Sequence, residues 1–170
     1  LVPTRDGFRP DVHLDHGAST TTFEPVWQAF RQALRLSAAQ RPALVARVRA
    51  LCAAFLGADP QGVDVLFTGN TTESILLVAE SLGLEDWGGT APVVVNTILE
   101  HNSNELPWRG VPGASQVRLG VDEAGFVDLE ELEEVLASHN ARHEHGRQRV
   151  VLVAVTGASN VLGTCNDLGA

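Results

Sequence analysis

Apolar side chains recur along this chain at helical spacing in some segments and in short continuous runs in others. In residues 42–56, the apolar side chains fall on one face of a helix, with Pro42 at its start and Gly57 just past its end. Asp128 followed by Glu131 is a capping-box pair that opens another helix. The pattern predicts helices over residues 23–36, 42–56, 72–82 and 128–137.

The continuous apolar runs predict short buried strands between these helices. The strongest run, residues 149–155, is β-branched and apolar on both faces. Such strands, when helices separate them, form a mostly parallel sheet covered on both sides, so we expect a three-layer α/β/α fold. Strands are predicted over residues 63–67, 92–95, 115–119 and 149–155. The polar segment 138–149 is predicted to be a mobile surface loop.

The composition argues against several classes of function. The 170 residues include 12 basic and 21 acidic side chains, which argues against a nucleic-acid binder because such proteins neutralise phosphates with basic residues. No apolar run approaches the roughly 18 residues that span a bilayer, so we expect no membrane contact. Cys52 and Cys165 are too few for a disulfide scaffold and too far apart for a CxxC site, which favours a reduced, cytoplasmic protein.

Lysine and methionine are both missing from the chain. All 12 basic residues are arginine, which excludes every mechanism that needs a lysine amine within this chain, including Schiff-base formation. The chain also contains no methionine, not even at position 1, which indicates an excerpt of a longer protein.

Three junctions that follow predicted strands are rich in small and polar residues, and ligands of α/β sheets bind at such junctions. Residues 68–73 offer a helix N-terminus to a phosphate, although an ordinary N-cap explains the same residues. In residues 100–108, His101 is either an acid, base or stacking ring, or a structural histidine bonded by its neighbours. In residues 157–164, the simpler interpretation is a tight glycine turn.

A metal site is a weaker hypothesis. One group of polar residues resembles a metal cluster, but its spacing fits no specific zinc pattern, so we predict no metal. These residues are His139, His143, Glu144 and His145. Cys52 lies on the apolar face of its helix, as a small core residue would.

Four segments share their residues and their order with one family. They are residues 14–20 (LDHGAST), 67–73 (FTGNTTE), 100–108 (EHNSNELPW) and 158–164 (ASNVLGT). They resemble, in turn, the LD-x-[AG]-A-[ST], F-[TV]-x-G-[AT]-T-E, EHHxNxxPW and SNVLGT segments of the cysteine desulfurases and other class V aminotransferases. Because the four segments occur in the family's order and span residues 14–164, the chain is identified as resembling this family.

The resemblance implies a pyridoxal 5′-phosphate site. The backbone amides of Thr71 and Thr72, with the Thr72 hydroxyl, would hold the cofactor phosphate. His101 would stack on the pyridine ring and act as the catalytic group that moves protons, and Asn160 would bond to the phenolic oxygen of the ring. The residues implied to lie beside the substrate are His16, Ala18 and Ser19.

The resemblance also implies a place in a larger protein. Residues 1–170 would form the N-terminal portion of one large domain of fold type I, with residues 1–40 as its N-terminal segment. The aspartate that pairs with the pyridine nitrogen, the Schiff-base lysine, the catalytic cysteine of desulfurases and the small C-terminal domain all come later in the family. Cys165 is at the wrong place to be that cysteine. Asn70 stands where the family has glycine, and Asn102 replaces the second histidine.

The implied parent enzyme acts on an amino acid and transfers sulfur or an amino group through an external aldimine. Cysteine desulfuration is our first expectation, a homodimer is implied, and the lysine-free chain alone is predicted to be inactive. The alternative is a non-catalytic α/β binding module that retains an anion pocket. A nucleotide-binding enzyme is disfavoured because neither GxGxxG nor a P-loop lysine is present.

Overall fold

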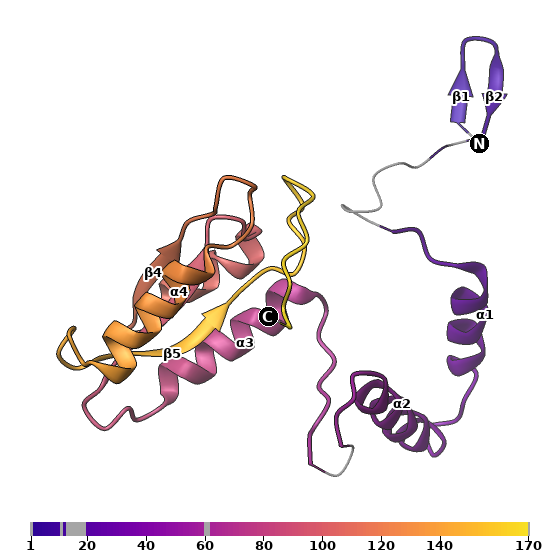
Figure 1. The fold of residues 1–170 in the computed structure, drawn as a ribbon. Helices are drawn as coiled ribbons and strands as arrows, with labels where there is room; N and C mark the ends of the chain where they lie inside the picture. The colour runs from indigo at the N-terminus through magenta and orange to yellow at the C-terminus, as the bar shows by residue number, and fades with distance from the viewer. Residues whose placement is uncertain (1, 11, 13–19, 60–61, 170) are drawn as a thin grey trace. The chain divides into compact units, whose positions relative to one another are not determined.

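The computed structural model describes residues 2–10, 12, 20–59 and 62–169 (Figure 1). The chain divides into two compact units, residues 1–67 and residues 68–170, and each is described by itself. Among the described residues, no helix combines the length and the apolar character that crossing a membrane requires.

The first unit contains a short hairpin and two helices. Strands β1 (Val2–Thr4) and β2 (Gly7–Arg9) pair antiparallel, and they precede α1 (Glu24–Ala33) and α2 (Arg41–Phe55). Both helices confirm the predicted ones, although α1 ends three residues early.

The predicted strand over residues 63–67 is wrong. The segment is not a strand, and it pairs with no strand in the part of the chain that the structure describes. A strand needs a hydrogen-bonding neighbour, and an apolar run cannot supply one. Leu66 and Phe67 are accordingly more than half exposed.

A three-stranded parallel sheet organises the second unit. Strand β3 (Ala91–Thr97) lies between β4 (Ser115–Leu119) and β5 (Gln148–Ala154), and both pairings are parallel. The central strand is buried on both faces, as its uninterrupted apolar run predicts. The three strands confirm the predicted ones to within two residues at each end.

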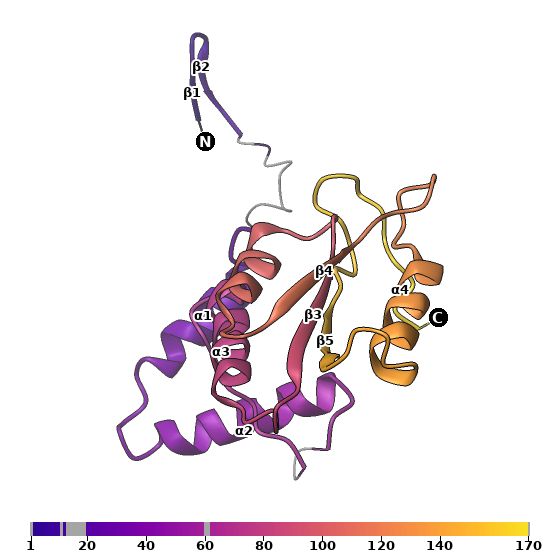
Figure 2. The same cartoon turned by 90° about the vertical axis from the view of Figure 1, so that its left-hand side faces the viewer.

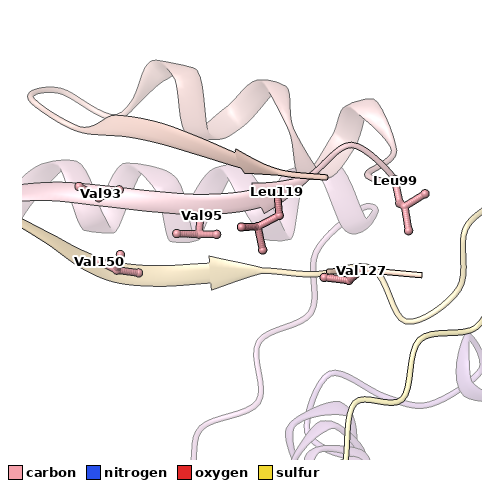
Figure 3. Packing of buried hydrophobic residues seen from close by; sticks show 6 residues of the cluster. All are labelled: Val93, Val95, Leu99, Leu119, Val127 and Val150. Atoms are coloured by element: carbon pink, nitrogen blue, oxygen red, sulfur yellow. The ribbon is translucent and has the colours of Figure 1, made fainter. Parts of the chain in front are cut away.

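Helices cover both faces of this sheet. Helix α3 (Thr71–Leu84) packs on the face of Val94, whereas α4 (Leu129–Leu136) packs on the face of Val93 and Val95. Figure 2 shows the two helices on opposite sides of the strands. Figure 3 shows the larger core cluster: Val93, Val95, Leu99, Leu119, Val127 and Val150. The predicted three-layer α/β/α arrangement is confirmed.

Helix α3 continues past the residue predicted to stop it. The helix includes Gly83 and ends at Leu84. A Cβ atom at Gly83 would lie 2.8 Å from Cδ of Pro112, so this glycine permits a close approach between α3 and the segment that leads to β4.

Residues 138–149 were predicted to be a mobile surface loop. The structure confirms that residues 140–147 lie at the surface, but the segment also makes specific contacts that the prediction did not include. A π-helical turn, η3 (Ala137–Ala141), buries His139, whose ring stacks on that of His145 with centroids 3.9 Å apart. Asn140 bonds to both backbone groups of Val150, donating to its carbonyl at 2.9 Å and accepting from its N–H at 2.8 Å. The polar composition did not predict the two Asn140 bonds, because they join a side chain to the backbone of β5.

Candidate functional site

The N-terminus of α3 begins the candidate site. The side chain of Asn70 caps the helix, accepting a hydrogen bond from the N–H of Glu73 at 2.9 Å, and the Glu73 carboxylate accepts one from Gly69 N–H at 2.5 Å. The N–H groups of Thr71 and Thr72 bond to none of the described residues. Two donors of the first helical turn are therefore free to bind an acceptor from outside the helix.

Asn70, which stands where the resembled family has glycine, adopts an unstrained backbone conformation. Its φ is −169° and its ψ is 172°, which is extended backbone, so the turn needs no left-handed residue there. A close contact lies one position earlier, where a Cβ atom at Gly69 would lie 2.8 Å from a carboxylate oxygen of Glu73 and would displace that side chain.

His101 caps a short 3₁₀ turn, η1 (Asn102–Asn104), that follows β3. The imidazole Nδ1 accepts a hydrogen bond from Ser103 N–H at 3.2 Å and lies 2.8 Å from the Ser103 hydroxyl. A backbone N–H can only donate, so Nδ1 carries no proton in this arrangement and the proton of the neutral ring is on Nε2.

The structure brings Thr72 and His101 together. Both line one open hollow of about 400 Å³ between α3 and the loop after β3. The remaining lining residues are Leu76, Asn102, Ser103, Leu106 and Pro107. Thr72, which belongs to the first turn of α3, and His101 thus border the same space together with apolar residues.

Asn160 is not among the residues that line this hollow. It is exposed in the turn after β5, where Ala158 and Cys165 form an isolated bridge and the Ser159 hydroxyl accepts from the N–H groups of Val161 and Leu162. The same segment is anchored to the His101 loop, because Thr156 N–H donates to the Glu100 carboxylate at 2.8 Å.

Two carboxylates that the sequence analysis did not single out hold the His101 loop. Glu100 accepts hydrogen bonds from Thr97, Asn104 and Thr156. Glu105 is buried, and its carboxylate pairs with both Arg109 and Arg118, which joins the loop to β4. Arg118 precedes the last residue of β4, and no local sequence pattern predicts that it reaches Glu105.

The other candidates lie elsewhere. His16, Ala18 and Ser19 are outside the described residues. Within the described ranges, no group of three or more His, Cys, Asp or Glu side chains could hold a metal. Cys52 is half-buried in α2, and Cys165 is exposed at a separate hollow beside α4.

Curated proteins and a solved structure are similar to this chain. A cysteine desulfurase of Haloferax volcanii is 34% identical over 119 residues, covering 68% of this chain and 25% of its own length. One from Dickeya dadantii is 32% identical over 145 residues, covering 84% of this chain and 32% of its own length. The crystal structure of the cysteine desulfurase CsdA from Escherichia coli superposes with a TM-score of 0.67 at 28% identity, over 91% of this chain and 39% of that one.

The relatives that match this chain are longer than the chain. The chain spans between a quarter and two-fifths of the length of these relatives. The structural likeness confirms the predicted fold type I architecture for the part of the fold that this chain represents. The family model for class V aminotransferases matches residues 12–170, and the chain therefore belongs to the class V aminotransferase family.

Proposed function

We propose that this chain is the N-terminal part of a pyridoxal-phosphate-dependent enzyme of the cysteine desulfurase type, which acts on an amino acid. The observation that supports the proposal is the shared hollow: Thr72 and His101, 29 positions apart in the sequence, line one space at the N-terminus of α3.

The residues at this place fit a phosphate. The N–H groups of Thr71 and Thr72 have no partner among the residues that the structure describes, and the positive end of the α3 dipole favours an anion there. The Thr72 hydroxyl adds a third donor. In a chain with a formal charge of −9, such a concentration of donors is a specific feature rather than part of a generally basic surface.

Each side chain has a separate task in the proposed site. His101 lines the hollow and its ring bonds to Ser103, and we propose that the flat face of this ring stacks on a pyridine ring. Asn160 is proposed to donate its carboxamide N–H to the phenolic oxygen of the ring. The cofactor, when bound, would supply an electron sink for the carbanion at the Cα atom of the substrate.

The proposal extends to the whole protein. Since this chain has no lysine, we propose that it is inactive alone and that a later segment supplies the lysine. We further propose a cytoplasmic homodimer whose substrate is cysteine, because the curated relatives are named cysteine desulfurases.

The test is turnover by the full-length protein loaded with pyridoxal phosphate. We expect one alanine per sulfur atom removed from L-cysteine in the presence of a thiol. Transfer of amino groups without release of sulfur would instead indicate an aminotransferase. Binding of the cofactor with no turnover of any amino acid would favour the non-catalytic module.

A pair of threonine variants tests the phosphate site. Thr72→Val removes one hydroxyl and keeps the shape, so the dissociation constant of the cofactor is expected to rise at least about tenfold, the effect of losing a hydrogen bond to a charged group. Thr90→Val is the matched control, because the Thr90 side chain bonds to none of the described residues. Equal affinities of the two variants would contradict the assignment.

A further inference from the structure

The carboxylate of Glu100 joins three segments that meet at the edge of the sheet. We propose that Glu100 is a positioning residue, which sets the separation between the loop that bears His101 and the loop that bears Asn160. This inference rests on the proposed function, since those two side chains are proposed to act on one ring.

The two carboxylate oxygens are divided between the segments. Oε1 accepts from the Thr97 hydroxyl at the end of β3 and from the Thr156 N–H after β5, each at 2.8 Å. Oε2 accepts from the Asn104 amide in η1 at 2.6 Å. Glu100 is only partly exposed, so these bonds are partly shielded from competition by water.

Two of the partners of Glu100, Asn104 and Thr156, are themselves held by further hydrogen bonds. The Asn104 carbonyl accepts a hydrogen bond from the buried Trp108 indole at 2.8 Å. The Thr156 carbonyl accepts from Asn166, whose side-chain oxygen in turn accepts from Val127 N–H at the base of α4. A change in the length of the Glu100 side chain would therefore shift one loop relative to the other rather than be absorbed by loose segments.

The length of the Glu100 side chain matters more than its charge, because the side chain must reach Asn104 and Thr156 together. Glutamine has the same length, its oxygen can replace Oε1, and its NH₂ group can face Asn104 if that amide turns over. The turned Asn104 would exchange the longer contact of its Oδ1 with the Trp108 indole, at 3.3 Å, for its NH₂ group, while the indole N–H keeps its shorter bond to the Asn104 carbonyl at 2.8 Å. Aspartate keeps the charge but is one methylene shorter, so it cannot reach Asn104 and Thr156 together.

The experiment compares Glu100→Gln, Glu100→Asp and the control Glu133→Gln in the full-length protein. The Glu133 side chain is exposed on α4 and bonds to none of the described residues. In the cofactor-free protein, hydrogen exchange of the Thr156 N–H is expected to stay within about threefold of wild type in E100Q and E133Q. In E100D it is expected to be at least about tenfold faster, because the bond to a charged acceptor is lost.

The loaded enzyme supplies the second readout, the visible circular dichroism of the bound cofactor, which reports the orientation of its ring. We expect the band of E100D to change and those of E100Q and E133Q to match wild type. Wild-type exchange and an unchanged band in E100D, or a larger effect in E100Q than in E100D, would overturn the inference. If the wild-type protein takes up no pyridoxal phosphate, the proposed function fails and the positioning role fails with it, while the exchange rates still report whether Glu100 ties the two loops.

Discussion

At the scale of single residues, Asn96 is the most unusual group in the core. It lies on the central strand with 1% of its surface exposed, and neither its Oδ1 nor its Nδ2 has a hydrogen-bond partner in the structure. An unpaired buried amide destabilises a fold by about 1–3 kcal/mol. Asn96→Leu keeps the branching at Cγ and removes both polar atoms, so we expect the free energy of unfolding to rise by about 1 kcal/mol or more.

Urea unfolding of the purified protein measures this effect. Asn104→Leu is the matched control, and it should be destabilising because the Asn104 amide donates to Glu100 at 2.6 Å. A loss of stability in N96L would mean that an ordered water or another group satisfies Asn96.

Glu144 gives a residue-scale prediction about pH. The Arg142 guanidinium donates a hydrogen bond to its carboxylate at 2.7 Å, which lowers the pKa of Glu144 below the ordinary value of 4.5. The stabilisation from this pair is therefore present above pH 4.5 and is lost as the pH falls through the lower pKa of the folded state. We expect the difference in Tm between wild type and Glu144→Gln to be constant near neutrality and to vanish in acid.

The effect should be small throughout, because both side chains are exposed and water screens the pair. Glu133→Gln is again the control, and its difference from wild type should not follow the same window. A difference for E144Q that grows as the pH falls would contradict the predicted sign.

At the scale of elements, the cap of α3 links helix stability to anion binding. Asn70→Ala removes the acceptor of the Glu73 N–H and is expected to cost about 1 kcal/mol of stability. Asn70→Asp keeps the acceptor and should hold the stability near that of wild type. Its added negative charge beside the free amides should weaken binding of pyridoxal phosphate roughly fivefold at low salt and less at high salt.

Chemical denaturation and calorimetric titration of the two variants separate these effects. Loss of affinity in N70A alone, with N70D unaffected, would show that helix order rather than electrostatics determines binding at this end of α3.

Helices and strands could be predicted from the sequence where residues within the segment itself determine its structure. The apolar run of β3 and the capping pair of Asp128 and Glu131 are local signals, and both elements formed as expected. Residues 63–67 carry the same kind of apolar run and failed, because a strand also depends on a neighbour that the run itself cannot specify. The turn at His139 was missed for the opposite reason: its polar side chains are satisfied by backbone groups of α4 and β5.

At the scale of the whole molecule, the sequence predicted part of the candidate site. The order of the family-like segments suggested that Thr72 and His101 share a space, and the structure brings both to one hollow. The role of Glu100 was not predictable, since one of its partners is a backbone N–H 56 residues away, and backbone groups leave no trace in residue identity. The positions of Thr71, Thr72, His101 and Asn160 relative to a bound cofactor remain a prediction of the resemblance.

The last prediction concerns association of the chain. Helix α1 exposes a row of large apolar side chains, and the rings of Trp27 and Phe30 stack on each other with centroids 5.8 Å apart. Apolar surface of this kind promotes association, because burying it removes it from water. We therefore expect the 170-residue chain to self-associate in light scattering, and Phe30→Glu to lower its average mass towards that of a monomer. Gln32→Glu adds the same charge on the other face of α1 and should leave the mass unchanged. If both variants lowered the mass equally, net charge rather than this apolar face would control association.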